Sequence, residues 1–290
     1  FKGSTTNNIV LDAKMVASVH GCPAHTSVFY DTNPACPTDQ RYKLLVACTA
    51  RPKNIPPQGL YVMGSGDGYR FRLLSGKPCM TDSPFDTQSV IFWDAVAKTY
   101  RAYYRWCRAG KRNVATTSSE DILNFPPGKF IERDSGDLYE LYTNQMQPYY
   151  RAPHIFLGFP MRYYDRGKAA WEWPAIRALP NYEGRKARYK DGEGERARYG
   201  IAVTDAILLA GRDGVKFKAW NEAFIRPGPR SKENWVYGDN FIVKGMIELP
   251  SGLEDAPNEI NLYSTESYWE GYGTKFRRNT ECSAWSKRPV

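Results

Sequence analysis

The sequence is poor in the residues that build most metal and redox sites. Its 290 residues include three His and six Cys, and the cysteines form no C-x-x-C pair and no spacing with the histidines that suits a tetrahedral metal site. We therefore predict no metal site and no cofactor. The even number of cysteines permits disulfides, but scattered buried thiols are the more common outcome in a domain of this size.

Long apolar runs are also missing. No stretch of about 18 apolar residues is present, so the sequence predicts no membrane span, and no secretory leader is evident. Because the chain begins at Phe1 without Met, we expect a fragment or a processed form of a longer protein. The compartment stays open, with a secreted or periplasmic location favoured, and the sequence does not predict the oligomeric state.

Acidic residues are outnumbered by basic ones. The 40 Lys and Arg against 31 Asp and Glu give a formal net charge of +9, which favours anionic partners through long-range attraction. No basic helix, helix-turn-helix pattern or zinc-finger spacing accompanies this charge, so we predict no nucleic acid partner. An acidic carbohydrate fits the charge as well.

Aromatic residues, Gly and Pro are abundant. Aromatics make up 14% of the chain, beside 24 Gly and 20 Pro, and this composition favours strands and tight turns over long helices. Two similar antiparallel strand pairs are predicted, 27–31 with 41–47 and 85–94 with 99–106. A turn marker of Asp with Phe four residues later then closes three successive units, at Asp67, Asp121 and Asp213. Ser stands two residues before the aspartate in the first two markers, and Gly211 stands there in the third.

The repeat defines the predicted architecture. Units of about 50 residues cover roughly 26–74, 89–130, 140–225 and 239–270, and the third is longer because residues 165–200 form a polar insertion. In the last unit, 241–247 is expected to pair with 259–265. Repeated four-strand units stack or close into a ring, so we predict a single all-β domain over 1–290. It is a five-bladed β-propeller whose first blade is missing or partial in this chain.

The segment 85–93 begins with Phe-Asp and ends with Phe-Trp. It resembles the five-bladed propellers of glycoside hydrolase families 32 and 43, in which an aspartate precedes an inner strand that ends in an aromatic pair. The turn marker is similar to that of the same superfamily. Residues 2–10, 31–43, 141–144 and 157–163 look like a group of poorly characterised bacterial propellers described as family 32-like. The resemblance implies hydrolysis of a glycosidic bond by carboxylates.

Three departures from the family 32 pattern are visible. Asp86-Thr87 stands where that family has Asp-Pro, Glu140-Leu141 stands roughly where it has Glu-Cys-Pro, and no Asn-Asp-Pro nucleophile motif is present. A complete catalytic set therefore depends on residues of the expected missing N-terminal part.

The repeat also predicts where the chemistry lies. In antiparallel neighbours the start of one strand lies beside the end of the next, so carboxylates at strand starts and arginines at strand ends should meet at one mouth of the ring. Glycoside cleavage needs a proton donor and a second carboxylate that acts as base or nucleophile. The predicted catalytic residues are Asp86, Glu140 and Glu266.

Further residues are predicted to bind the substrate. Arginines would hold a carboxylate or sulfate on the sugar through paired hydrogen bonds, and aromatic side chains would stack on sugar faces. The structural alternatives are an ion pair between Asp86 and Arg105, ordinary ion pairs for the glutamates, and a core role for the aromatics. The predicted binding residues are His25, Arg105, Trp106, Tyr142, Arg162 and Asp239.

Three functions follow from these residues. The first is a glycosidase, and the net charge suggests that its carbohydrate substrate is acidic or sulfated. The second is a non-catalytic glycan-binding propeller. The third, a sialidase-like enzyme, calls for three clustered arginines, of which Arg105 and Arg162 supply two. Two axial carboxylates separated by about 5.5 Å would indicate retaining hydrolysis and about 6.5–9.5 Å inverting hydrolysis, whereas a single carboxylate would favour binding.

Overall fold

A computed structural model describes residues 11, 16–19, 26–48, 57–136, 139–179, 182, 185–186, 200–229, 235, 237–238 and 240–265. These residues form sheets in which nearly all described neighbours are antiparallel, with a few short helical turns, which confirms the all-β prediction. The chain divides into two compact units. The first comprises residues 1–134, 146–157 and 210–217, and the second comprises 135–145, 158–209 and 218–290.

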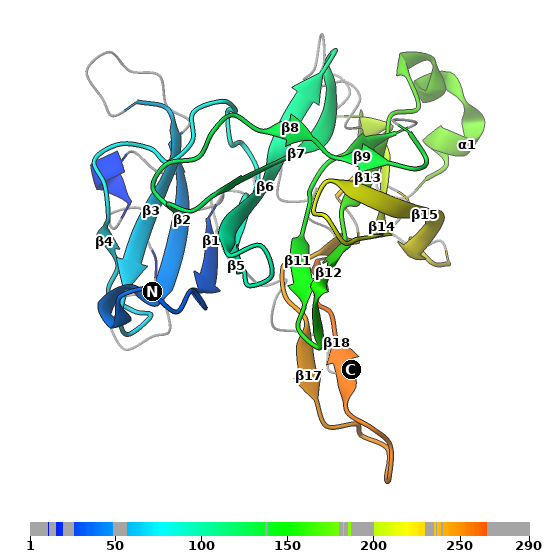
Figure 1. The fold of residues 1–290 in the computed structure, drawn as a ribbon. Helices are drawn as coiled ribbons and strands as arrows, with labels where there is room; N and C mark the ends of the chain where they lie inside the picture. The colour runs from blue at the N-terminus through cyan, green and yellow to red at the C-terminus, as the bar shows by residue number, and fades with distance from the viewer. Residues whose placement is uncertain are drawn as a thin grey trace, which may run out of the picture. The chain divides into compact units, whose positions relative to one another are not determined.

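The first sheet of unit 1 has four consecutive strands side by side, coloured blue to cyan in Figure 1. The strand pair predicted from the sequence is confirmed, since Ser27 lies opposite Leu45 and Tyr30 opposite Tyr42. A short 3-10 helix, η3 (Thr38–Gln40), lies in the connection. The strands are β1 (Ser27–Tyr30), β2 (Tyr42–Cys48), β3 (Gly59–Ser65) and β4 (Arg72–Leu73).

The second sheet repeats this order. Asp94 lies opposite Thr99 and Val90 opposite Tyr103, so the second predicted strand pair is confirmed from Val90 onward. The expected strand was too long, because residues 85–89 lie before it and Phe85 has a positive φ that an extended strand does not allow. The tight turn between these strands places Lys98 at φ 54°. The strands are β5 (Val90–Asp94), β6 (Thr99–Arg108), β7 (Lys111–Ser119) and β8 (Lys129–Phe130).

Both faces of the first sheet are covered. One face shares a core with the second sheet, in which Leu45 and Val62 pack with Ile91, Tyr104 and Ala115. The other face packs against η1 (Ala17–Val19). This explains the uninterrupted apolar run in β2, because a strand that is covered on both sides has no polar face. The four-stranded order suits a propeller blade, and closure of a ring stays a prediction.

The predicted turn markers are turns. The Asp67 carboxylate accepts hydrogen bonds from the backbone N–H groups of Tyr69 and Arg70, both at 2.8 Å. Asp121 accepts one from Leu123 N–H at 2.9 Å. Asp213 likewise accepts bonds from Val215 and Lys216.

The third marker turn packs within unit 1, next to the second sheet. Tyr103 Oη donates to the carbonyl of Gly214 at 2.9 Å, and the rings of Phe92 and Phe156 lie 5.9 Å apart. The main chain of 215–217 pairs with β9. The remaining strands here are β9 (Glu132–Arg133), β11 (Met146–Tyr149) and nearly all of β12 (Ala152–Gly158).

The third repeat, which includes residues of both units, differs from the predicted one. The expected second strand, 155–159, lies in β12 as far as Gly158, and β12 pairs with β11. The strand opposite Leu141 is the one that contains Arg162. The apolar run 155–163 is divided at Gly158 and Pro160, and apolar periodicity alone does not show which half pairs with which neighbour. The strands are β10 (Glu140–Leu141), β13 (Met161–Tyr164), β14 (Val203–Gly211) and β15 (Lys216–Ile225).

The expected polar insertion carries a small core of its own. It includes η4 (Lys168–Glu172) and α1 (Pro174–Arg177), and Trp171 and Ile176 are buried together with Ile201. The side chain of Arg185 is almost fully buried and donates to the carbonyl of Leu179 at 2.7 Å. The described part of the insertion is therefore partly folded rather than a purely polar loop.

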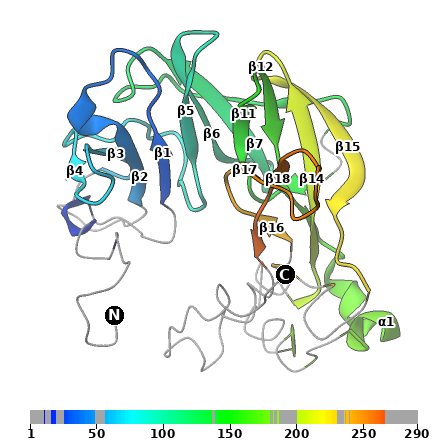
Figure 2. The ribbon, with the colours of Figure 1, turned by 90° about the horizontal axis from the view of Figure 1, so that it is seen from below.

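The last described strands form two short antiparallel pairs. The pairing predicted between 241–247 and 259–265 is confirmed, because Ile242 lies opposite Ser264 and Ile247 opposite Asn261. Figure 2 shows β17 and β18 side by side. The strands are β16 (Phe241–Ile242), β17 (Ile247–Leu249), β18 (Glu259–Asn261) and β19 (Ser264–Thr265).

Candidate functional site

Asp86 and Arg105 form an ion pair in unit 1. Arg105 Nη1 lies 3.1 Å from Asp86 Oδ2, and the side chain of Arg105 is 6% exposed whereas that of Asp86 is 50% exposed. The antiparallel argument from the sequence predicted that these two residues meet, and their ion pair is also the contact that the structural alternative expected. A buried arginine thus holds a carboxylate whose other side faces solvent.

The backbone just before Asp86 has an energetically unfavourable conformation. Phe85 has a positive φ of 48°, which is rare for an aromatic residue and costs about 1–3 kcal/mol. Its side chain is fully buried and packs on the ring of Tyr104, with centroids 5.4 Å apart. Ser83 Oγ donates to the carbonyl of Arg105 at 2.7 Å. Packing and hydrogen bonding therefore fix the position of Asp86.

Asp82 is a second carboxylate in this segment, and the sequence did not predict it as a site residue. Tyr104 Oη donates to Asp82 Oδ2 at 2.5 Å, and the N–H of Gly128 donates to the same oxygen at 3.0 Å. Burial raises the pKa of Tyr104 well above its ordinary value, so this hydroxyl stays a donor. The sequence feature that could have identified Asp82 is its position four residues before Asp86 in the same segment.

Trp106 is partly engaged in packing. Its ring stacks on that of Phe130 at 4.9 Å with an interplanar angle of 19°, and the guanidinium of Arg108 lies 4.6 Å from the same Phe130 ring. The ring of Trp106 remains half-buried, beside the end of β6 that carries Arg105.

Two predicted residues of unit 2 are buried or packed. Glu140 is 8% exposed and lies opposite Tyr163 in the ladder of β10 and β13. The ring of Tyr142 stacks on Tyr163 at 5.8 Å, and its hydroxyl accepts a hydrogen bond from Tyr237 Oη at 2.5 Å. Tyr142 thus belongs to an aromatic cluster of this unit.

Arg162 is held by protein groups through three nitrogens. Its Nε and Nη2 donate to the two oxygens of Asp205 at 2.8 and 2.5 Å, and its Nη1 donates to the carbonyl of Asn221 at 2.8 Å. The hydrogen bond with Asp205 raises the pKa of Arg162 above its usual range. Asp205 was missed from sequence, because only the structure shows that it lies directly across from Arg162 in the ladder of β13 and β14.

Three predicted site residues, His25, Asp239 and Glu266, lie outside the described residues. Asp86, Arg105 and Trp106 belong to unit 1, whereas Glu140, Tyr142 and Arg162 belong to unit 2. The convergence of the carboxylates on one mouth therefore stays a prediction.

The described residues carry neither a metal cluster nor a membrane-spanning helix. No group of three or more His, Cys, Asp or Glu among them is arranged to hold a metal ion. No helix in the same ranges has the length and hydropathy needed to cross a membrane. The four described cysteines are free, with Cys36, Cys48 and Cys79 buried and Cys107 exposed.

Comparison with known proteins gives weak matches. No family model matches the chain, and no curated protein matches it. The chain is similar to the crystal structure of an N-acetylgalactosamine deacetylase from F. plautii in complex with blood group B trisaccharide. That match has 14% identity and a TM-score of 0.39, and covers 71% of this chain and 53% of that one. This chain therefore spans about half the length of that protein.

A second similar structure is a complex of BT0996 and RGII. It has 12% identity and a TM-score of 0.39, with coverage of 82% of this chain and 68% of the other. Neither of these proteins is described as a member of glycoside hydrolase family 32 or 43, so that resemblance stays a prediction. Likenesses of this size assign no function.

Proposed function

We propose that the chain binds a carbohydrate and hydrolyses a glycosidic bond, with Asp86 as one of its catalytic carboxylates. The observation that supports this proposal is the half-exposed carboxylate of Asp86, held by the buried guanidinium of Arg105 at 3.1 Å. A carboxylate that is paired with a cation suits a base or a nucleophile rather than a proton donor. Asp86 takes that role here, and Glu140 and Glu266 are its proposed partners.

The strained backbone before Asp86 agrees with this role. Rare backbone conformations persist where surrounding packing enforces them, and they cluster at functional sites. Phe85 is such a residue, with a φ of 48° and a fully buried ring. The same packing would keep Asp86 in place during a reaction, which proximity effects in catalysis require.

An acidic or sulfated sugar is the proposed substrate class because of the net charge of +9. Arg105 is the proposed contact to the substrate beside Asp86, and the half-buried ring of Trp106 is the proposed stacking surface. Arg162, bound to Asp205 and Asn221, stabilises the strands of unit 2 in this proposal. His25, Tyr142 and Asp239 keep their predicted roles as binding residues.

A non-catalytic glycan-binding protein is the second candidate. It is favoured by the pairing of both described candidate arginines with carboxylates, Arg105 with Asp86 and Arg162 with Asp205. Such pairs are neutral overall and offer donors and acceptors to sugar hydroxyls. A sialidase-like function, which needs three clustered arginines, draws less support from arginines paired in this way.

The test is a screen of uronate-containing and sulfated oligosaccharides for both binding and cleavage. We expect the wild-type protein to release new reducing ends, and Asp86→Asn to lower kcat about 10²–10⁴-fold while binding is retained. Asp39→Asn is the matched control, because Asp39 pairs with Arg72 at 2.5 Å on an exposed surface of the same unit. Its activity should equal that of the wild type.

Each outcome decides between the candidates. Binding without cleavage by the wild-type protein would establish the glycan-binding function and refute the hydrolase. Equal activity of Asp86→Asn and Asp39→Asn would remove Asp86 from the mechanism. A panel in which no glycan binds would refute both candidates.

A further inference from the structure

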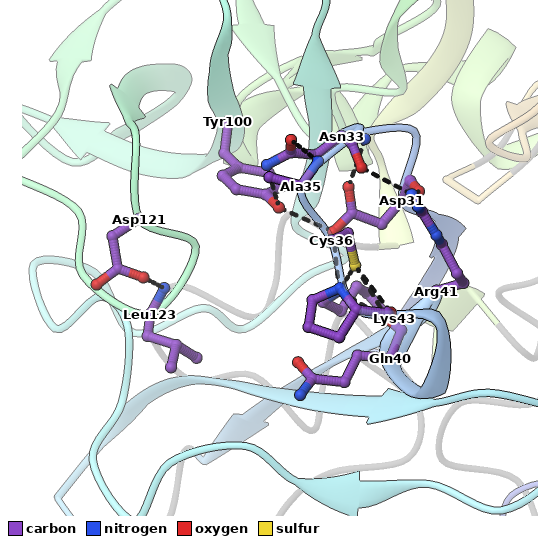
Figure 3. Close-up of polar contacts among 11 residues, drawn as sticks. Asp31, Asn33, Ala35, Cys36, Gln40, Arg41, Lys43, Tyr100, Asp121 and Leu123 are labelled. Atoms are coloured by element: carbon purple, nitrogen blue, oxygen red, sulfur yellow. Dashed lines mark hydrogen bonds and ion pairs between the residues drawn. The ribbon is translucent and has the colours of Figure 1, made fainter.

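A buried group of reactive side chains, none of which has a role in the proposed function, lies where the chain passes from β1 to β2 (Figure 3). Lys43 and Cys36 are 1% and 6% exposed, and Asp31 is fully buried. Lys43 Nζ lies 3.0 Å from Cys36 Sγ and 2.8 Å from Asp31 Oδ2. An amine, a thiol and a carboxylate are thus in direct contact inside the protein.

Each member of the group is fixed by further contacts. Asp31 accepts hydrogen bonds from the N–H of Asn33 at 3.0 Å and from Tyr100 Oη at 2.9 Å. Lys43 also donates to the carbonyl of Gln40 at 2.7 Å. The N–H of Cys36 donates to the carbonyl of Asn33 at 3.0 Å in a tight turn. The amine and the thiol are therefore held against each other.

We propose that Cys36 and Lys43 form an oxidative modification site, at which dioxygen converts the contact into a covalent N–O–S cross-link. One oxygen atom is inserted between Nζ and Sγ, so that an N–O and an O–S bond form while the S–H bond and N–H bonds break. The other oxygen atom leaves as water.

The electrons and protons of this step balance. Dioxygen accepts four electrons, two from the sulfur and two from the nitrogen. An ammonium, a thiol and O₂ give the cross-link, one water and one proton. Asp31, at 2.8 Å from Nζ, is placed to accept that proton.

The charges of the buried group also favour the product. Removing one partner from a buried ion pair leaves an uncompensated charge and is strongly destabilising. Here the cross-link and the protonated Asp31 are both neutral, so no charge is left unpaired. Tyr100 Oη and Asn33 N–H keep the carboxyl group hydrogen-bonded.

The rate of the reaction is expected to be low. Burial raises the pKa of the Cys36 thiol above its ordinary value, so little thiolate is present at neutral pH, and the thiolate is the reactive form of cysteine. Cys107, which is exposed, should be oxidised sooner by the same treatment. The two cysteines can therefore be followed separately in one time course.

Peptide mapping of the full chain tests the proposal. The protein is held in air-saturated buffer, digested with trypsin without reductant, and analysed by mass spectrometry. Trypsin cleaves after Arg41, which lies between Cys36 and Lys43, so the cross-link joins two peptides that otherwise separate. We expect a joined pair whose mass exceeds that of a disulfide-linked pair by one oxygen atom, and its disappearance after treatment with dithiothreitol.

Three variants complete the test. Cys36→Ser and Lys43→Arg, which keep a hydroxyl or a positive charge at these positions, should abolish the joined pair, and Cys107→Ser should leave it unchanged. A joined pair lacking the extra oxygen would identify a disulfide, such as one between Cys22 and Cys48, and overturn the proposal. Cys36 carrying oxygen with its peptide unjoined, or a joined pair that persists in Cys36→Ser, would also overturn it. None of these readouts depends on glycan cleavage.

Discussion

At the scale of single residues, the aspartates of this chain have three different roles. Asp67 shapes a turn through backbone hydrogen bonds, Asp31 is buried against Lys43, and Asp86 is half exposed beside Arg105. The Ser-Gly-Asp-Gly spacing identifies Asp67 as a turn former from sequence alone. Asp31 and Asp86 both adjoin strands, and only packing separates the structural ion pair from the candidate catalytic group.

The turn role of Asp67 makes a prediction about acid stability. Hydrogen bonds from the N–H groups of Arg70 and then Tyr69 lower the pKa of Asp67 from 3.8 to about 2. Because the folded-state pKa is depressed, the stabilisation is complete above 3.8 and is lost as the pH falls through about 2. We expect Asp67→Asn to be less stable than the wild type above pH 3.8, with the difference shrinking toward pH 2.

Urea unfolding of both proteins at one pH above 3.8 and one near 2 measures this effect. Asp39→Asn serves as a control for the loss of a surface carboxylate that forms an ion pair rather than a turn. A difference between the wild type and Asp67→Asn that stays constant with pH would contradict the prediction.

At the scale of elements, Gly128 allows the chain just before β8 to pack closely on β6 and β7. A Cβ atom at Gly128 would overlap Tyr104 Oη and would lie 3.1 Å from the carbonyl oxygen of Thr116. Since that hydroxyl donates to Asp82, it cannot move without breaking a partly buried hydrogen bond. Gly128→Ala is expected to lower the free energy of unfolding by about 1–3 kcal/mol through overpacking.

The matched control is Gly76→Ala, because a Cβ atom there would meet nothing within 4 Å. It should be neutral or stabilise the protein by at most about 1 kcal/mol. Urea midpoints at an unchanged m value provide the comparison. Equal stability of the two alanine variants would show that Tyr104 shifts to accommodate the added methyl group, and would contradict the prediction.

The elements also show how far the sequence predicts the structure. The strand pairs 27–31 with 41–47 and 85–94 with 99–106 follow from apolar runs bounded by polar turns. The first is present, and the second is present from Val90 onward. The meeting of Asp86 with Arg105 follows from the same antiparallel geometry. The pairing of β10 with β13, and the link between Arg162 and Asp205, depend on which of several similar runs become neighbours. Periodicity within one strand carries no information about that choice.

At the scale of the whole molecule, the prediction of one domain over 1–290 is open to a direct measurement. A single compact domain of 290 residues has an expected radius of gyration of about 19 Å. Small-angle X-ray scattering of a monodisperse sample should give a value near this, with a single maximum in the distance distribution. A clearly larger radius with two maxima would show that the chain forms separate domains and would refute the single propeller.

The insertion enters and leaves the fold at one point. Tyr164, the last residue of β13, lies directly opposite Val203, the first residue of β14, so the segment 165–202 begins and ends at the tip of one hairpin. Each doubling of a loop's length costs only about 0.6 kcal/mol in closure entropy. This tip can therefore accept segments of different length and sequence without shifting the register of the strands, and it is a natural position for grafting a foreign domain or a reporter into the protein.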